Sequence, residues 1–207
     1  MLKTPPKPFT PKAKSKASRV VSKTFGLLGL VALVPLNGCA APYDATKGYT
    51  GSTSVIRDSH FPARNSSAIN FFIVTKINGH AVENSVEATA QRSFGLGNVQ
   101  IPVTRSHPLP VTPLMITIQG VTRYGAPIMS LINKIYDVSG VVRFVPQAGE
   151  EYEVRGVLGE AGTSVWIENS KGEIVQGTMV GYVDVQKTGE AFPASLLDAK
   201  AAAVRGK

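Results

Sequence analysis

The stretch 140–158, GVVRFVPQAGEEYEVRGVL, decides the fold class of this chain. Apolar and polar residues alternate on both sides of the link PQAGEEY, and a period of two indicates strands with one buried face. The link has the composition of a strand connector. The alternation here and in 163–170 predicts the inward side chains Val142, Phe144, Tyr152, Val154, Val165 and Ile167. It predicts the outward side chains Arg143, Glu153 and Arg155.

Further strands are expected on both sides of this stretch. The run 68–77, AINFFIVTKI, is rich in β-branched and aromatic residues and stops at Asn78-Gly79, a strong hairpin signal. The remaining expected elements are a returning strand at 80–86, a loop with an edge strand at 92–103, an extended proline-rich connector at 107–113, a core strand at 114–122, and strands at 163–170 and 173–185. Short strands at this spacing are typical of a β-sandwich or barrel.

One segment, 126–138, fits a strand or a helix. Pro127 suits the first turn of a helix. Ile128, Leu131, Ile132 and Ile135 recur at i, i+3, i+4 and i+7, which is one face of a helix. We therefore expect one short helix at an end of the sheet.

The distribution of charge argues against nucleic-acid binding. The formal net charge of the 207 residues is +8. Residues 1–24 hold seven of the 22 basic residues and no acidic residue, which leaves 15 basic and 14 acidic residues elsewhere. A nucleic-acid footprint needs basic residues clustered on the folded domain. We expect no nucleic-acid partner.

The only cysteine, Cys39, lies three residues after an uncharged apolar run at 25–36. This run is too short to cross the ~30 Å hydrocarbon core of a bilayer as a stable anchor. The run fits the apolar region of a secretory signal. Leu36-Asn37-Gly38-Cys39 resembles the lipobox of bacterial lipoproteins. The resemblance implies cleavage between Gly38 and Cys39 and acylation of the cysteine. A buried core thiol and an uncleaved anchor remain alternatives.

These patterns divide the chain into four parts. They are a signal peptide at 1–38, a lipid-anchored flexible tether at 39–54, a β-sandwich domain at 55–185, and a tail at 186–207 that is a frayed helix or disordered. The residue after the cysteine is Ala40 rather than Asp. In the lipoproteins that the chain resembles, this implies the outer membrane, here with the domain facing the periplasm.

A second resemblance concerns the domain. Asn78-Gly79, the turn from Pro146 to Tyr152 and the strand VWIENSKGEIV look like parts of the PEGA and transthyretin-like sandwich domains of envelope lipoproteins. The resemblance covers about residues 68–176 and departs at an insertion between 92 and 139. It implies an all-β fold, a single immunoglobulin- or transthyretin-like β-sandwich. It implies nothing about activity.

A search for chemistry finds no catalytic constellation. His60, His80 and His107 lack the spacing of a metal pair and read as solvated loop residues, so neither a metal nor a cofactor is expected. No G-x-S-x-G elbow lies between a strand and a helix. Glu150, Glu151 and Glu168 are the carboxylates that a hydrolase would use.

The leading hypothesis is a non-enzymatic envelope lipoprotein, a structural or interaction module held on the membrane by its lipid. Its partners would be envelope proteins or glycans. The alternative hypothesis is a carbohydrate- or peptide-binding module that uses Trp166, Tyr124 or Tyr136 as stacking surfaces.

Overall fold

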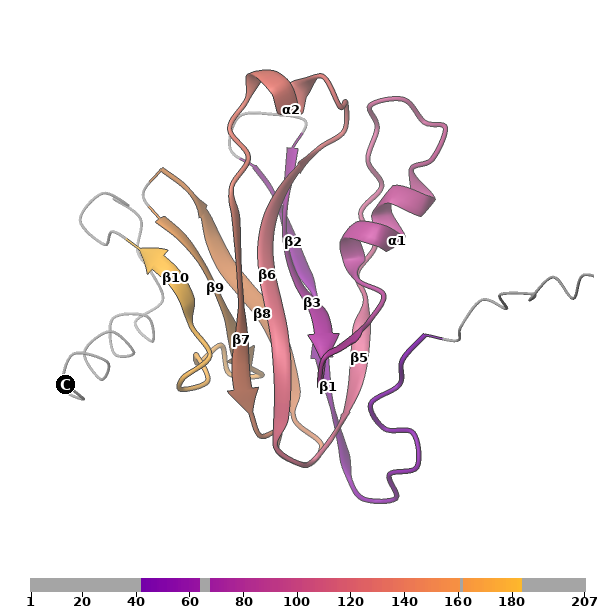
Figure 1. The fold of residues 1–207 in the computed structure, drawn as a ribbon, viewed down its shortest axis with the longest axis vertical. Helices are drawn as coiled ribbons and strands as arrows, with labels where there is room; N and C mark the ends of the chain where they lie inside the picture. The colour runs from indigo at the N-terminus through magenta and orange to yellow at the C-terminus, as the bar shows by residue number, and fades with distance from the viewer. Residues whose placement is uncertain (1–41, 64–67, 161, 184–207) are drawn as a thin grey trace, which may run out of the picture. The chain divides into compact units, whose positions relative to one another are not determined.

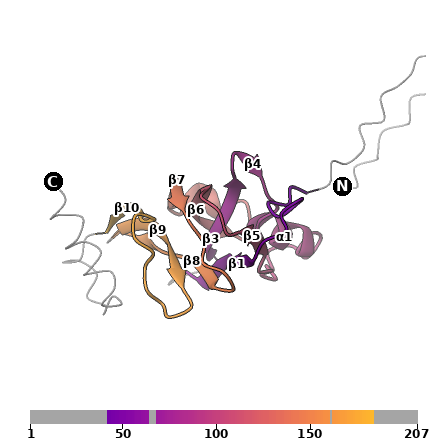
Figure 2. The same ribbon diagram turned by 90° about the horizontal axis from the view of Figure 1, so that it is seen from below.

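Two five-stranded sheets face each other in the computed structural model, which describes residues 42–63, 68–160 and 162–183 (Figure 1). In the first sheet the order is β10 (Val180–Val183), β9 (Gly162–Asn169), β8 (Glu151–Gly159), β1 (Thr53–Arg57) and β5 (Ser106–Pro110). In the second sheet the order is β2 (Ser59–Pro62), β3 (Ala68–Ile77), β6 (Leu114–Tyr124) and β7 (Asp137–Phe144), with β4 (His80–Ala81) also paired to β3. Seen from below, the two sheets form two layers (Figure 2). The all-β sandwich expected from the sequence is confirmed.

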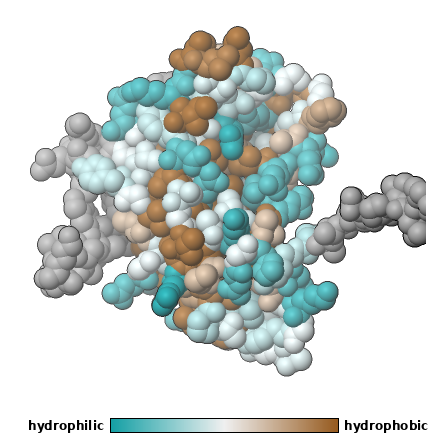
Figure 3. All heavy atoms as spheres, viewed as in Figure 1, coloured by the Kyte–Doolittle hydropathy of each residue, from teal (hydrophilic) through white to brown (hydrophobic). Residues whose placement is uncertain are grey.

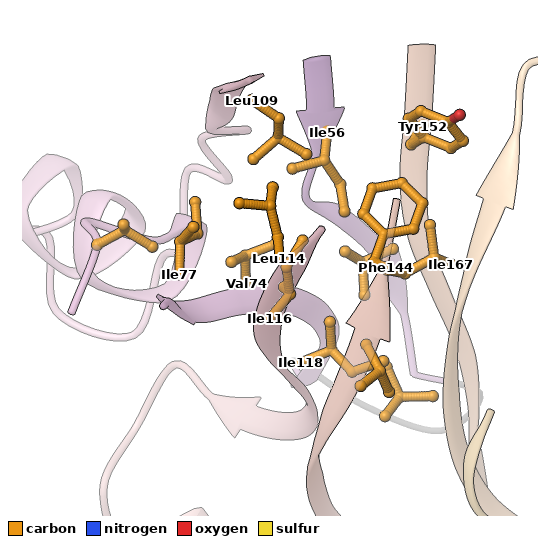
Figure 4. Packing of buried hydrophobic residues seen from close by; sticks show 14 of the residues in the cluster. Ile56, Val74, Ile77, Leu109, Leu114, Ile116, Ile118, Phe144, Tyr152 and Ile167 are labelled. Atoms are coloured by element: carbon orange, nitrogen blue, oxygen red, sulfur yellow. The ribbon is translucent and has the colours of Figure 1, made fainter. Parts of the chain in front are cut away.

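The core lies between the two sheets and is built from the alternating side chains (Figure 4). All six side chains that the alternation predicts as inward are buried. Phe144 of β7 meets Tyr152 of β8 edge to face, with ring centroids 4.7 Å apart. This geometry is favourable for aromatic pairs and joins the two layers directly. Arg143 is exposed, whereas Glu153 and Arg155 are half-buried on the outer face of the first sheet.

Phe72 of β3 fills the space between the sheets at two glycines. A Cβ atom added to Gly156 of β8 would collide with the Phe72 ring and with the backbone oxygen of Ser164. A Cβ atom on Gly120 of β6 would also press on the Phe72 ring, at 3.2 Å. Gly156 therefore lets the ring pack against the backbone of β8.

We expect Gly156→Ala to destabilise the fold by about 1–3 kcal/mol, because the added methyl group overpacks the contact with Phe72. Gly159→Ala on the same strand is the matched control, since nothing lies within 4 Å of its Cβ position. Urea unfolding of both variants measures the difference. Equal midpoints for the two variants would contradict this account of the packing.

Asp58, only 1% exposed, sits where the chain leaves β1 in the first sheet for β2 in the second. Its Oδ1 accepts a hydrogen bond from the backbone N–H of Val74 in β3. On that edge of β3, Val74 lies between the residues that pair with β2 and those that pair with β4. Its Oδ2 accepts from both the N–H and the hydroxyl of Ser85, each at 2.8 Å. The N–H of Asp58 donates to the carbonyl of Arg105, just before β5. The side chain and backbone of Asp58 together thus join four segments.

We expect Asp58→Asn to cost about 3 kcal/mol of unfolding free energy. An amide cannot accept all three hydrogen bonds, and a buried donor left unpaired costs about 1–3 kcal/mol. Asp137→Asn is the control, because Asp137 is exposed and bonds only the Gln119 side chain among the described residues. Chemical denaturation checks both variants. If Asp58→Asn lowers the unfolding free energy no more than Asp137→Asn does, Asp58 does not act as the clamp that holds these segments together.

Helix α1 (Ser85–Arg92) stands where the sequence analysis expected a returning strand, and that expectation was wrong. The returning strand has only two residues. The side chain of Asn84 then caps the helix by accepting from the N–H groups of Val86 and Glu87. No strand forms at 92–103, and the expected connector at 107–113 contains β5, which pairs with β1. The described chain therefore has two helices, where one was expected.

The second helix, α2 (Met129–Ile132), lies inside the segment 126–138 for which a short helix was predicted. It has no buried residue. The four side chains that the spacing puts on one helical face are all exposed. No helix of the described residues is long and apolar enough to span a membrane.

The described residues before β1 contact the sandwich. Tyr43 and Ala45, which the sequence analysis assigns to the tether, pack against the core. Tyr43 also stacks on His80, with ring centroids 4.4 Å apart. The predicted signal peptide, the bond between Gly38 and Cys39, and the tail at 186–207 lie outside the described residues.

Candidate functional site

A cluster of exposed apolar side chains covers one end of the sandwich, and we call it the apolar end. It comprises the exposed apolar residues of the segments 93–105 and 125–136. The first segment, which follows α1, contributes Phe94, Leu96, Val99 and Ile101. The second segment, which contains α2 and joins β6 to β7, contributes Ile128, Leu131, Ile132 and Ile135.

The two segments touch each other. A Cβ atom on Gly125 would collide with the backbone oxygen of Asn98 and come within 3.4 Å of the Gln100 side chain. Figure 1 places both segments at the end where β6 finishes and β7 starts. Apolar atoms stand out over α2 in the space-filling view (Figure 3). The apolar end is therefore one surface built by two loops.

The exposure of these side chains is extreme. Phe94 is 91% exposed and Leu131 is 82% exposed. An aliphatic or aromatic side chain left in water forgoes about 1.5–3 kcal/mol of burial free energy. Single exposed apolar residues are common, but a contiguous group on one end of a domain marks an interaction surface.

The charges around the apolar end are unevenly distributed. Residues 88–136 contain Arg92, Arg105, Arg123 and Lys134 but no aspartate or glutamate. Arg105 pairs with Glu83 at 2.6 Å. Lys134 pairs with Glu160, whose carboxylate raises the pKa of the lysine. Neither Arg92 nor Arg123 forms an ion pair with another residue that the structure describes.

Two of the three predicted stacking residues lie at the apolar end. Tyr124 and Tyr136 are half-buried. The hydroxyl of Tyr124 donates to the carbonyl of Lys134 at 2.9 Å, and the N–H of Thr122 donates to the carbonyl of Tyr136. The structure thus brings these two tyrosines to one region, at the two ends of the segment that carries α2.

Trp166, the third predicted stacking residue, is 3% exposed and lies elsewhere, on β9. Its indole N–H donates to Glu168 at 2.7 Å. A ring without an exposed face cannot stack on a ligand, so the expectation for Trp166 does not hold. Alternation could not decide this point, because residues on both faces of β9 are buried.

A shallow cleft of about 330 Å³ lies over the outer face of β8 and β9, and charged side chains line it. Glu151 pairs with Arg57 at 2.9 Å, and Glu153 pairs with Arg155 at 2.7 Å. Glu150 lies beside the strand start, where hydrogen bonds from Ser170 hold the pKa of its carboxyl below the usual value. A glycosidase acid needs the opposite shift. The carboxylates suggested for a hydrolase are therefore held by neighbouring donors.

The histidines differ from the expectation that all three are solvated. His107 is buried in β5, with Nε2 3.7 Å from Oδ1 of Asp58. Ser85 and Asp58 complete a buried Ser–Asp–His group that the sequence did not reveal. A catalytic triad places the histidine between the acid and the nucleophile. Here Ser85 is fully buried and donates to Asp58 directly, so the group serves the fold.

Among the described residues, no group of three or more histidine, cysteine, aspartate and glutamate side chains is arranged to hold a metal ion. No family model, no curated protein and no solved structure matches the chain. The interpretation of the apolar end therefore rests on the structure of this chain alone.

We expect the triple variant Ile128→Ser, Leu131→Ser, Ile132→Ser to unfold within about 0.5 kcal/mol of the parent, because surface changes away from packed contacts cost little. Ile118→Ser in the core is the contrasting variant and should lose several kcal/mol. Thermal unfolding measures both. A loss above about 2 kcal/mol for the triple variant would mean that these side chains serve packing rather than binding.

Proposed function

We propose that this protein is a lipid-anchored envelope lipoprotein that acts as a non-enzymatic interaction module. The observation that carries the proposal is the sequence Leu36-Asn37-Gly38-Cys39 directly after an uncharged apolar run. A small residue before the cysteine gives a peptidase access to the bond. The thiolate of the cysteine is the nucleophile that accepts a diacylglyceryl group.

The domain offers support of two kinds. Its polar clusters are accounted for by hydrogen bonds and ion pairs that stabilise the sandwich, such as Asp58 with Ser85. Its exposed apolar end has the character of an interaction surface. The turn at Asn78-Gly79 joins β3 to its paired strand β4, and the connection at 145–150 carries the chain from β7 in the second sheet to β8 in the first.

The proposed mechanism is confinement. Acyl chains contribute about 0.8 kcal/mol for each buried methylene, so two or more chains hold a protein stably on a bilayer. A domain confined to the membrane surface meets envelope partners at a raised effective concentration. We place the domain on the outer membrane, facing the periplasm, because Ala40 follows the cysteine.

The alternative is a binding module for a carbohydrate or a peptide. The burial of Trp166 weakens the carbohydrate version, since sugars need an exposed ring to stack on. The peptide version has one observation in its favour. Arginines and glutamates lie side by side in the cleft over β8 and β9, where they could pair with a charged peptide.

Cys39→Ser should abolish incorporation of a labelled fatty acid and leave the longer precursor uncleaved, because serine lacks the thiolate that accepts the lipid. Ala40→Ser is the matched control and should label normally. Metabolic labelling followed by gel electrophoresis measures both. Labelling that survives in Cys39→Ser would overturn the lipoprotein proposal.

Ala40→Asp tests the proposed location. On the resemblance to bacterial lipoproteins, aspartate after the cysteine should shift the protein from the outer to the inner membrane, whereas Ala40→Ser should leave it in place. Membrane fractionation on a density gradient distinguishes the two. An unchanged distribution for Ala40→Asp would speak against the outer-membrane placement.

A further inference from the structure

We propose that the apolar end inserts into the surface of an anionic phospholipid bilayer. This contact is separate from the lipid proposed on Cys39 and does not depend on it. Three features of the described residues carry the proposal: the shape of the surface, the charges that frame it, and the position of two tyrosines.

The shape favours a fluid partner. Phe94, Leu131 and Ile132 each expose more than 70% of their surface, so they protrude from their loops rather than line a flat face. A protein partner would need a hollow that matches these protrusions, whereas hydrocarbon chains rearrange around them. A second copy of this chain is less suitable, because the cleft over β8 and β9 is lined by charged side chains.

The charges favour an anionic surface. Arg92 stands two residues before Phe94, and Arg123 stands two residues before Gly125, so a basic residue introduces each loop. Long basic side chains bury their stems in apolar surroundings and hold the charge at the phosphate level. Two acidic side chains near the second loop are engaged: Glu160 pairs with Lys134, and Asp137 accepts from the Gln119 side chain.

The two tyrosines at the apolar end also suit the interface between a bilayer and water. Tyr124 and Tyr136 are half-buried at the two ends of the segment that carries α2, and the Tyr124 hydroxyl donates to the carbonyl of Lys134 in that segment. Tyrosine is favoured at the interface between hydrocarbon and water, because its ring is apolar and its hydroxyl is polar. The apolar end thus combines exposed aliphatic side chains with tyrosines and arginines, the residue types favoured where an inserted loop meets the headgroup region.

The test uses the full chain and places a fluorescent probe at one end of the sandwich or at the other. Because Cys39 is the only cysteine, Cys39→Ser makes any introduced cysteine unique and removes the lipid. Leu131→Cys carries an environment-sensitive fluorophore at the apolar end, and Lys171→Cys carries it in the turn after β9. With vesicles of phosphatidylglycerol and phosphatidylcholine, the probe at 131 should shift to shorter wavelength and brighten at least twofold. The probe at 171 should not change.

The basic residues are tested with the same probe. Adding Arg92→Gln and Arg123→Gln to Leu131→Cys should raise the vesicle concentration for half of the response by about thirtyfold, given ~1 kcal/mol for each basic residue at an anionic surface. If the Arg variants respond at the same vesicle concentration as Leu131→Cys alone, the proposed preference for an anionic lipid surface is wrong.

Two other outcomes would overturn the proposal. One is a probe at 131 that does not respond to vesicles. The other is a probe at 131 that shifts without vesicles as the protein concentration rises, which would assign the surface to a second copy. Every variant carries Cys39→Ser, which removes the lipid but keeps residues 1–38, so the difference between the probes at 131 and 171, rather than vesicle binding itself, decides the proposal whatever the labelling result.

Discussion

The carboxylate of Asp58 is the interaction on which the rest of the architecture depends. At this residue the chain passes from one sheet to the other, and a backbone that changes layers leaves N–H groups without strand partners. Asp58 accepts from two of these groups, on Val74 and Ser85, and from the Ser85 hydroxyl. A buried carboxylate is stable only when donors surround it. The crossing point and its partners therefore form together or not at all.

The position of the apolar end follows from this clamp. Ser85 is the first residue of α1, so the bond to Asp58 fixes where the helix begins. The Ser85 hydroxyl also accepts from the N–H of Arg105, just before β5. Both ends of the segment between α1 and β5 are thus held at one place. That segment can only loop outward, and it reaches Gly125 at the end of β6.

Much of the sandwich could be predicted from the sequence, because strands with one buried face carry their orientation in their alternation. Helix α1 was missed since its eight residues have little apolar periodicity. The signal was Asn84 followed three residues later by Glu87, a pattern of helix starts. The apolar pattern at 128–135 was read as one face of a short helix at an end of the sheet, but only Met129–Ile132 is helical and the four apolar side chains of the pattern are exposed. Periodicity shows that a face is apolar and does not show what covers it.

The first described residues and the apolar end lie at opposite ends of the sandwich. Tyr43 stacks on His80, just beyond the end of β3 at Ile77, which pairs with the early β6 residue Ile116. The apolar end lies where β6 finishes. The 11 residues of β6 span about 36 Å at ~3.3 Å for each residue. One bilayer meets both ends only if the sandwich lies with its strands along the membrane. A sandwich with its strands upright on the membrane would bring only one of these two ends to it.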